Sequence, residues 1–301
     1  MTRVAVMGAG AVGCWIGAML ARAGEAVTLI GRPALVQAVA AQGLRLEMGG
    51  RVEVLHPEAT TDPAAVAGSD MVLVCVKSGD TEAAGRAMAP HLAPEALVLS
   101  LQNGIGNAET LARVTGQSAH PAVVYVAAAM AGPGHVLHRG RGELVVGPAA
   151  RDAAASLQRA GVPVTVSADV LEALWVKLTI NCALNALSAL TRQPYGAILG
   201  EPGAEDLLAG LVGECGAVAR GEGVGLPGDM LAQVLALARA MPGQMSSTAQ
   251  DLIAGKPTEI AALNGEVARR GAALGIAVPL NAAMVVMVNL AGQSVGSGVA
   301  R

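Results

Sequence analysis

A lysine and two asparagines recur at four-residue intervals in an otherwise apolar stretch. Lys177, Asn181 and Asn185 lie in the sequence VKLTINCALNALSAL. Positions i, i+4 and i+8 share one face of a helix, so the three polar groups form one stripe. Because an ammonium and two amides are costly to bury without partners, they must face one another, a cleft or a ligand. A lysine in a cleft can donate a proton, since desolvation lowers its pKa. The alternative is a polar network between helices that does no chemistry.

A glycine-rich loop near the start of the chain has a different chemistry. Gly8, Gly10 and Gly13 form G-x-G-x-x-G, with Ala11 and Val12 between the last two glycines. The loop follows a β-branched apolar run and opens a segment that favours helix, which is the context of a dinucleotide-binding turn. The first glycine permits the tight turn, the second lets the backbone approach a pyrophosphate, and the third lets helix and strand pack closely. The alternative is a strand–helix turn that binds nothing.

The residue after the second strand indicates which dinucleotide is bound. NAD-binding proteins place an acidic residue there for the ribose hydroxyls, whereas this chain has Gly31, Arg32 and Pro33. A guanidinium can form paired hydrogen bonds to a 2′-phosphate. Arg32 therefore favours NADP over NAD, with an exposed loop charge as the alternative.

Polar residues also follow two further predicted strands. Lys77 closes the strand MVLVCV, and Asn103 follows the strand LVLSLQ. In a doubly wound sheet both fall at the carboxyl edge, where ligands bind. The lysine can reach a phosphate, a ribose or a substrate carboxylate, and the asparagine amide can both donate and accept hydrogen bonds. A strand-capping lysine and an Asn-Gly turn are the alternatives.

The elements that position these residues divide the chain in two. We predict strands over 3–8, 26–30, 70–77, 96–102 and 162–166, with helices over 12–23, 81–89 and 108–114. Glycines punctuate residues 121–148, which we interpret as a meander or hairpins at the edge of the sheet, broken near 132–134 and 140–142. Beyond residue 169 only helical patterns remain. The predicted fold is therefore a Rossmann-like doubly wound α/β domain over 1–167 and an all-α domain over 168–301.

The composition excludes several classes of protein. The 301 residues are 53% hydrophobic and 14% charged, with a net charge of -3. This balance, with 1% aromatic residues, argues against a nucleic-acid partner. Residues 4–21 and 276–300 carry no charge, but glycine, proline and amide side chains interrupt them, so we expect no membrane partner. Four scattered cysteines favour a reducing cytoplasm, and no zinc-like spacing of ligands predicts a metal.

Several blocks of residues together resemble the ketopantoate reductase (2-dehydropantoate 2-reductase) family. They are GAGAVG at 8–13, VCVK ending at Lys77, QNG at 102–104, the helix LWVKLTINCALNALSAL, SS…QD at 246–251, TEI…NG at 258–265 and GIAVPLN at 275–281. The resemblance covers nearly the whole chain. It implies an enzyme that reduces the ketone of a branched 2-oxo acid, 2-dehydropantoate, to pantoate with NADPH, on the route to pantothenate.

The resemblance also implies roles for individual residues. Lys177 would be the general acid, and Glu259 would hold the reacting oxygen and orient that lysine. The remaining residues would bind substrate (Asn181, Asn185 and Ser247), lie beside both the nicotinamide and the substrate (Asn103), or lie on the cofactor side (Lys77 and Arg32). From the residues alone, Ser247 is a loop or cap residue, and Glu259 belongs to the first turn of a helix capped near Thr258.

One residue departs from the family pattern. A further substrate-binding asparagine is expected after the proline that ends the long helix, and this chain has Tyr195 there. The departure leaves a reductase of another 2-oxo acid or carbonyl open as an alternative. A dinucleotide-binding sensor without catalysis is a second alternative. A homodimer is possible, although no heptad pattern requires one.

Overall fold

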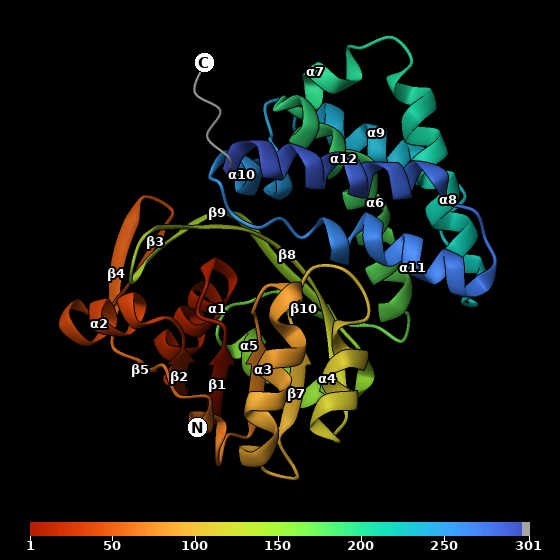
Figure 1. The fold of residues 1–301 in the computed structure, drawn as a ribbon. Helices are drawn as coiled ribbons and strands as arrows, with labels where there is room; N and C mark the ends of the chain where they lie inside the picture. Colours follow the sequence, from red (N-terminus) through yellow and green to blue (C-terminus); the bar gives the residue numbers. More distant parts are fainter. Residues whose placement is uncertain (297–301) are drawn as a thin grey trace. The chain divides into compact units, whose positions relative to one another are not determined.

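The computed structural model describes residues 1–296 and forms two compact units, Met1–Val170 and a second beginning at Leu171 (Figure 1). The first unit, unit 1, contains a ten-stranded sheet. Its strands are β1 (Arg3–Met7), β2 (Ala26–Ile30), β3 (Leu44–Met48), β4 (Arg51–Leu55), β5 (Glu58–Thr60), β6 (Met71–Val74), β7 (Leu97–Ser100), β8 (Ala119–Gly132), β9 (His135–Val146) and β10 (Val164–Val166). Its α-helices are α1 (Ala11–Arg22), α2 (Pro33–Gln42), α3 (Thr81–Met88), α4 (Asn107–Thr115) and α5 (Arg151–Arg159).

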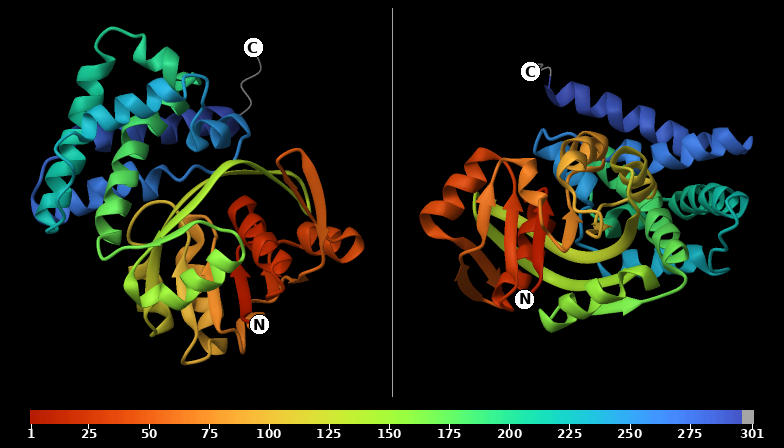
Figure 2. Two further views of the ribbon diagram at one scale, coloured as in Figure 1. Left: turned by 180° about the vertical axis from the view of Figure 1, so that it is seen from behind. Right: turned by 90° about the horizontal axis from the view of Figure 1, so that it is seen from below.

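Strand β1 lies in the middle of the parallel part of the sheet. The strand order is β4-β3-β9-β8-β7-β6-β1-β2-β5, with β10 beside β9. Val4 and Val6 of β1 pack in one core cluster with residues of α1 and α5, whereas Ala5 and Met7 pack in another with residues of α3 and α4. Helices therefore cover both faces (Figure 2), which explains why the strand sequences are continuously apolar. This confirms the predicted doubly wound α/β class.

The long β8–β9 hairpin corrects the prediction of strands at the sheet edge. Strand β9 pairs with β8 on one side and with β3 on the other, so the hairpin lies inside the strand order and β4 forms the edge. The β3–β4 hairpin was missed, although Gly49-Gly50 between two short β-prone runs is a hairpin signal. The break predicted at 140–142 is also wrong, because these residues lie within β9 beside irregularities of the β8–β9 register. Arg141 there has φ +58°, so the chain bulges rather than turns.

The second unit, unit 2, is helical throughout its described residues, as predicted. Its α-helices are α6 (Val170–Thr191), α7 (Tyr195–Leu199), α8 (Ala204–Gly221), α9 (Met230–Ala240), α10 (Ser247–Ile253), α11 (Asn264–Leu274) and α12 (Pro279–Gly296). Among residues 1–296, α6 alone is long and apolar enough to span a membrane, and 61% of its most apolar window is buried inside the protein. Helix α6 ends before Pro194, since the residue preceding a proline disfavours the helical conformation.

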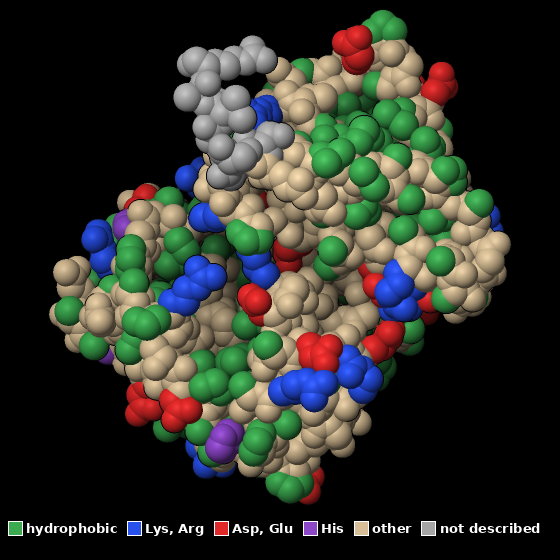
Figure 3. All heavy atoms as spheres, in the orientation of Figure 1, with side chains coloured by type: hydrophobic (Ala, Val, Ile, Leu, Met, Phe, Trp, Pro, Cys, Tyr) green, Lys and Arg blue, Asp and Glu red, His purple; other side chains and the backbone are tan. Residues whose placement is uncertain are grey.

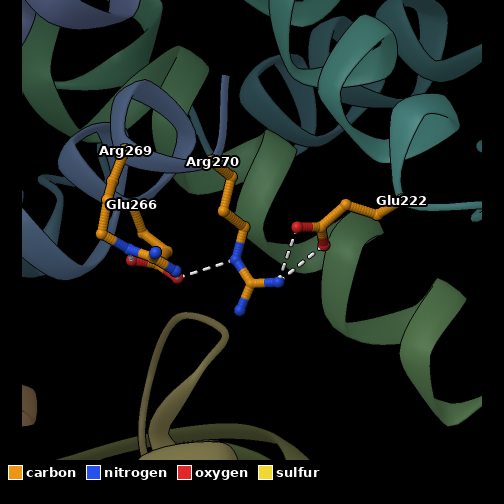
Figure 4. Close-up of polar contacts among 4 residues, drawn as sticks. All are labelled: Glu222, Glu266, Arg269 and Arg270. Atoms are coloured by element: carbon orange, nitrogen blue, oxygen red, sulfur yellow. Dashed lines mark hydrogen bonds and ion pairs between the residues drawn. The ribbon is translucent and has the colours of Figure 1, made fainter. Parts of the chain in front are cut away.

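A charged cluster of Glu222, Glu266, Arg269 and Arg270 ties helix α11 to the C-terminal end of α8 in unit 2 (Figure 4). The guanidinium of Arg270 on α11 donates to both carboxylate oxygens of Glu222, which caps α8, at 2.8 and 2.6 Å, and to Glu266 at 2.7 Å. Arg270 is 9% exposed. Burial raises the pKa of Glu266, but hydrogen bonds from Arg269 and Arg270 outweigh it and bring that pKa below its usual value.

The outer face of α12 carries apolar side chains. Val286, Met287 and Leu290 are exposed, and Val286 and Met287 lie four and three residues before Leu290, so both are its neighbours on the helix surface. Hydrophobic side chains gather over the helical unit in the space-filling view (Figure 3). The many apolar side chains of the protein therefore fill its cores and also form part of this surface.

Candidate active site in two parts

The glycine loop of unit 1 follows β1 and opens α1, as predicted. Gly8 has φ +103°, and a Cβ at that position would lie 2.4 Å from the main-chain nitrogen of Val76. A Cβ on Gly13 would lie 2.3 Å from the carbonyl oxygen of Gly8. These two glycines are therefore required by the turn itself and by the close approach of α1.

Gly10 leaves space where the other two glycines do not. It is exposed and occupies the N-cap position of α1, and a Cβ there would meet nothing within 4 Å. Ala11 and Val12 are half-buried in the first turn, which contains no acidic residue and no side-chain cap. A helix start with open space and no negative charge fits a dinucleotide pyrophosphate.

Arg32 lies immediately beyond β2, at the N-cap position of α2. Its side chain is exposed, and within residues 1–296 no carboxylate lies at ion-pairing distance from it. The preceding Gly31 donates its main-chain N–H to the Thr60 carbonyl at 2.9 Å, which fixes the path of the backbone. These features fit a guanidinium that binds a 2′-phosphate.

The segments carrying Lys77 and Asn103 lie side by side at the carboxyl ends of β6 and β7. The hydroxyl of Ser78 donates to the Asn103 carbonyl at 3.0 Å, and the Asn107 amide donates to the same oxygen at 2.9 Å. The Gln102 amide donates to the Val76 carbonyl at 3.0 Å. Lys77 is exposed and Asn103 is half-buried. The structure thus brings these two predicted residues to one sheet edge.

Sequence reasoning missed the side chains that hold this edge together. Gln102 and Asn107 are buried, and both bond the buried hydroxyl of Thr81, at 2.6 and 2.9 Å respectively. A glutamine at the end of an apolar strand was the available signal, because a buried amide needs partners.

The polar stripe of unit 2 lies on α6 as predicted. Lys177 and Asn181 are half-buried, and Asn185 is 4% exposed. The fully buried Thr179 donates its hydroxyl to the Trp175 carbonyl at 2.8 Å, within the helix. The three stripe residues are therefore arranged along one side of a helix whose most apolar window is 61% buried.

Ser247 and Glu259 begin two of the following segments. Ser247 is exposed at the start of α10, and Ser246 caps that helix by accepting from the Ala249 N–H at 3.0 Å. Glu259 is half-buried and immediately precedes a 3₁₀ helix, Ile260–Ala262, which its side chain does not cap. The α-helix starts only at Asn264, so the first-turn interpretation of Glu259 is wrong.

Tyr195 belongs to the core of the helical unit. It is the first residue of α7 and packs with Ala183 and Leu184 of α6 in one apolar cluster. Burial raises the pKa of its phenol to about 12. Its ring therefore fills apolar space, which an asparagine at this position could not fill.

Comparison with known proteins identifies the family. The family model "Ketopantoate reductase PanE/ApbA" matches residues 4–151, and its C-terminal model matches residues 169–291. The 2-dehydropantoate 2-reductases of Halobacterium salinarum and Caulobacter vibrioides are 37% and 36% identical to this chain. These alignments cover 96% and 97% of this chain, and 98% and 99% of the relatives.

A solved structure gives the same answer. The crystal structure of a PanE/ApbA family ketopantoate reductase from Ralstonia eutropha JMP134 is 54% identical, with a TM-score of 0.94. The match covers 97% of this chain and 99% of that one. The chain belongs to the ketopantoate reductase family of oxidoreductases.

Proposed function

We propose that this protein reduces a 2-oxo acid with NADPH, and that the substrate is 2-dehydropantoate and the product pantoate. The observation that carries the proposal is the polar stripe of Lys177, Asn181 and Asn185 on one side of a largely buried apolar helix. The stripe provides one ammonium and two amides, which can donate hydrogen bonds and, in the amides, also accept them. These groups match a substrate with a carboxylate, a ketone and a hydroxyl.

The cofactor part of the proposal rests on unit 1. Gly8, Gly10 and Gly13 with Ala11 and Val12 would hold the pyrophosphate, Arg32 the 2′-phosphate, and Lys77 and Asn103 the rest of the nucleotide. Bound NADPH supplies the hydride. The exposed guanidinium of Arg32 and the lack of an acidic residue after β2 support NADPH over NADH.

The chemical part rests on the ammonium of Lys177. Reduction of a ketone places negative charge on its oxygen, and a fixed cation within hydrogen-bond reach stabilises that charge and supplies the proton. Glu259 would orient the lysine and the reacting oxygen. Asn181, Asn185, Ser247 and Asn103 would bind the carboxylate and hydroxyl groups of the substrate.

Tyr195 supports a second candidate, a reductase of another 2-oxo acid on the same scaffold. A buried phenol ring in place of the expected asparagine removes one amide from the substrate contacts. This change fits a substrate that lacks the group to which the asparagine amide would bind.

The test is oxidation of NADPH and, separately, NADH with a panel of 2-oxo acids. We expect 2-dehydropantoate with NADPH to give the highest kcat/KM. Weak turnover of 2-dehydropantoate beside strong turnover of another acid would replace the first candidate with the second. Tight NADPH binding without turnover of any carbonyl would instead support a dinucleotide-binding sensor.

A further inference from the structure

Two serines form a buried hydrogen-bonded pair between α6 and α10. Ser188 and Ser246 are 0% and 1% exposed. The main-chain N–H of Ser246 donates to the Ser188 hydroxyl at 3.2 Å. The Ser246 hydroxyl donates to the main-chain carbonyl of Asn185 at 3.1 Å. A residue of the segment before α10 is thus bonded twice to α6, one turn apart.

Both hydroxyls have further partners. The Ser188 hydroxyl donates to the Gln193 carbonyl at 2.8 Å, just beyond the end of α6. The Ser246 oxygen also accepts the Ala249 N–H at 3.0 Å and so caps α10. A serine hydroxyl has one proton to donate and two lone pairs to accept, and each of these groups uses its proton and at least one lone pair within the protein. Because both side chains are also buried, neither hydroxyl is exposed to a ligand.

The segment before Ser246 is held by main-chain bonds as well. Tyr195 donates its N–H to the Gln244 carbonyl at 3.0 Å, and Gly196 donates to the Pro242 carbonyl at 2.9 Å. A Cβ on Gly196 would lie 2.9 Å from the Pro242 side chain, so the segments around Gly196 and Pro242 pass each other in close contact. Residues 242–246 are therefore held at one end by the start of α7 and at the other end, through Ser246, by α6.

This arrangement fixes the relative positions of two proposed substrate-binding residues. Asn185 supplies the carbonyl that Ser246 bonds, and Ser247 is the next residue along the chain. Any shift of α10 along α6 breaks the bonds of Ser246 to Asn185 and Ser188 together. The start of α10 therefore has one register relative to the polar stripe.

We propose that Ser246 and Ser188 are positioning residues that hold Ser247 and Asn185 at the spacing needed to bind the 2-oxo acid. The inference rests on the proposed function, because it takes those two residues as substrate contacts. The serines touch neither substrate nor cofactor, and they act through the residues they bond. Displacing a positioned group by about 1 Å can cost as much as 100-fold in activity.

The experiment compares Ser246→Ala and Ser188→Ala with wild type, using saturating NADPH and varied 2-oxo acid. We expect the KM for the acid to rise about 10-fold or more, while the KM for NADPH stays within about twofold of wild type. Ser246→Thr keeps the hydroxyl and should restore most of the affinity. Because the two serines share one network, the double variant should be less impaired than the product of the two single effects predicts.

Thr179→Val is the matched control. The substitution removes a fully buried hydroxyl that donates to a main-chain carbonyl of the same helix. That hydroxyl, unlike those of the two serines, does not connect α6 with α10. We expect its KM for the acid to equal that of wild type. A purely structural role of the serines would lower kcat in proportion to folded protein and leave KM unchanged, and that result would overturn the inference.

Failure of the inference and of the proposed function can be separated. Wild-type enzyme that reduces a 2-oxo acid, with serine variants of unchanged KM, overturns the positioning role alone. Wild-type protein that reduces no 2-oxo acid overturns the proposed function and the inference with it.

Discussion

The two units carry proposed binding residues of different kinds. In unit 1 the proposed nucleotide-binding turn is made of backbone, and what matters at Gly8, Gly10 and Gly13 is that no side chain is present. In unit 2 the proposed substrate-binding residues are side chains that project from one helix, α6. Backbone geometry depends on the local fold, whereas a projecting side chain can be exchanged while the helix remains.

This contrast predicts that substitutions in unit 1 damage folding or cofactor affinity, and that those in the stripe of unit 2 damage chemistry. It also predicts that the three glycines are not equivalent. Charged residues of the two units should also differ in their effect on stability, because Arg270, Glu222 and Glu266 of unit 2 are much less exposed than Arg113 and Glu82 of unit 1.

The largest effect is expected from Gly8→Ala. The added Cβ meets the Val76 nitrogen in a left-handed backbone conformation, so we expect a loss of roughly 2–5 kcal/mol in the free energy of unfolding of unit 1. Gly10→Ala is the control, since its Cβ meets no protein atom within 4 Å. It should unfold at the same urea concentration as wild type but bind NADPH more weakly. Equal stability of both variants would contradict the distinction.

Arg270→Met tests the buried charge of unit 2. Removal of the guanidinium leaves Glu222 and Glu266 without their shared partner, and we expect a loss of about 3 kcal/mol, measured by urea unfolding. Arg113→Met removes an exposed partner of Glu82 in unit 1 and should cost less than about 1 kcal/mol. Similar losses of unfolding free energy in both variants would show that burial does not make the Arg270 ion pairs more stabilising than the exposed Arg113–Glu82 pair.

Lys177→Met should impair catalysis without changing the stability of the fold. We expect kcat to fall about 100-fold, as for loss of a general acid, which corresponds to about 2.7 kcal/mol in the activation barrier. The unfolding midpoint and the affinity for NADPH should remain those of wild type. Turnover at the wild-type rate would remove the lysine from the mechanism.

Arg32→Ser tests the choice of cofactor. Loss of a charge-assisted contact to the 2′-phosphate should raise the KM for NADPH about 10-fold, with the KM for NADH unchanged because NADH lacks that phosphate. Equal effects on both cofactors would place the arginine elsewhere on the nucleotide.

The smallest effect is a dependence of stability on pH. Hydrogen bonds from Arg269 and Arg270 outweigh burial and bring the pKa of Glu266 below the ordinary value of 4.5. The stabilisation is therefore fully present above pH 4.5 and is lost as the pH falls through the lower pKa of the folded protein. Urea unfolding at pH 6, 5, 4 and 3 should show a smaller decline for Glu266→Gln than for wild type. A parallel decline in both would remove Glu266 as the source.

The sequence predicted those elements whose signals are local. The loop, β2 and α6 were found because glycine spacing, a β-branched run and a four-residue polar period are each contained within one element. The glycines at 140–142 predict a break where β9 bulges, and the β3–β4 hairpin is not predicted despite its Gly-Gly turn. Glycines mark turns and bulges alike, and the partner strand determines which of the two forms.

For this protein, the sequence by itself determined the nucleotide-binding turn, the polar stripe and the family, because each depends on residues a few positions apart. Only the tertiary structure decided that β9 lies between β3 and β8, that Gln102, Thr81 and Asn107 join two strand ends, and that Ser246 and Arg270 bond other helices. Those contacts join residues distant in the sequence. These hydrogen bonds form only where packing buries the polar groups next to one another. The spacing of residues along the sequence therefore does not predict them.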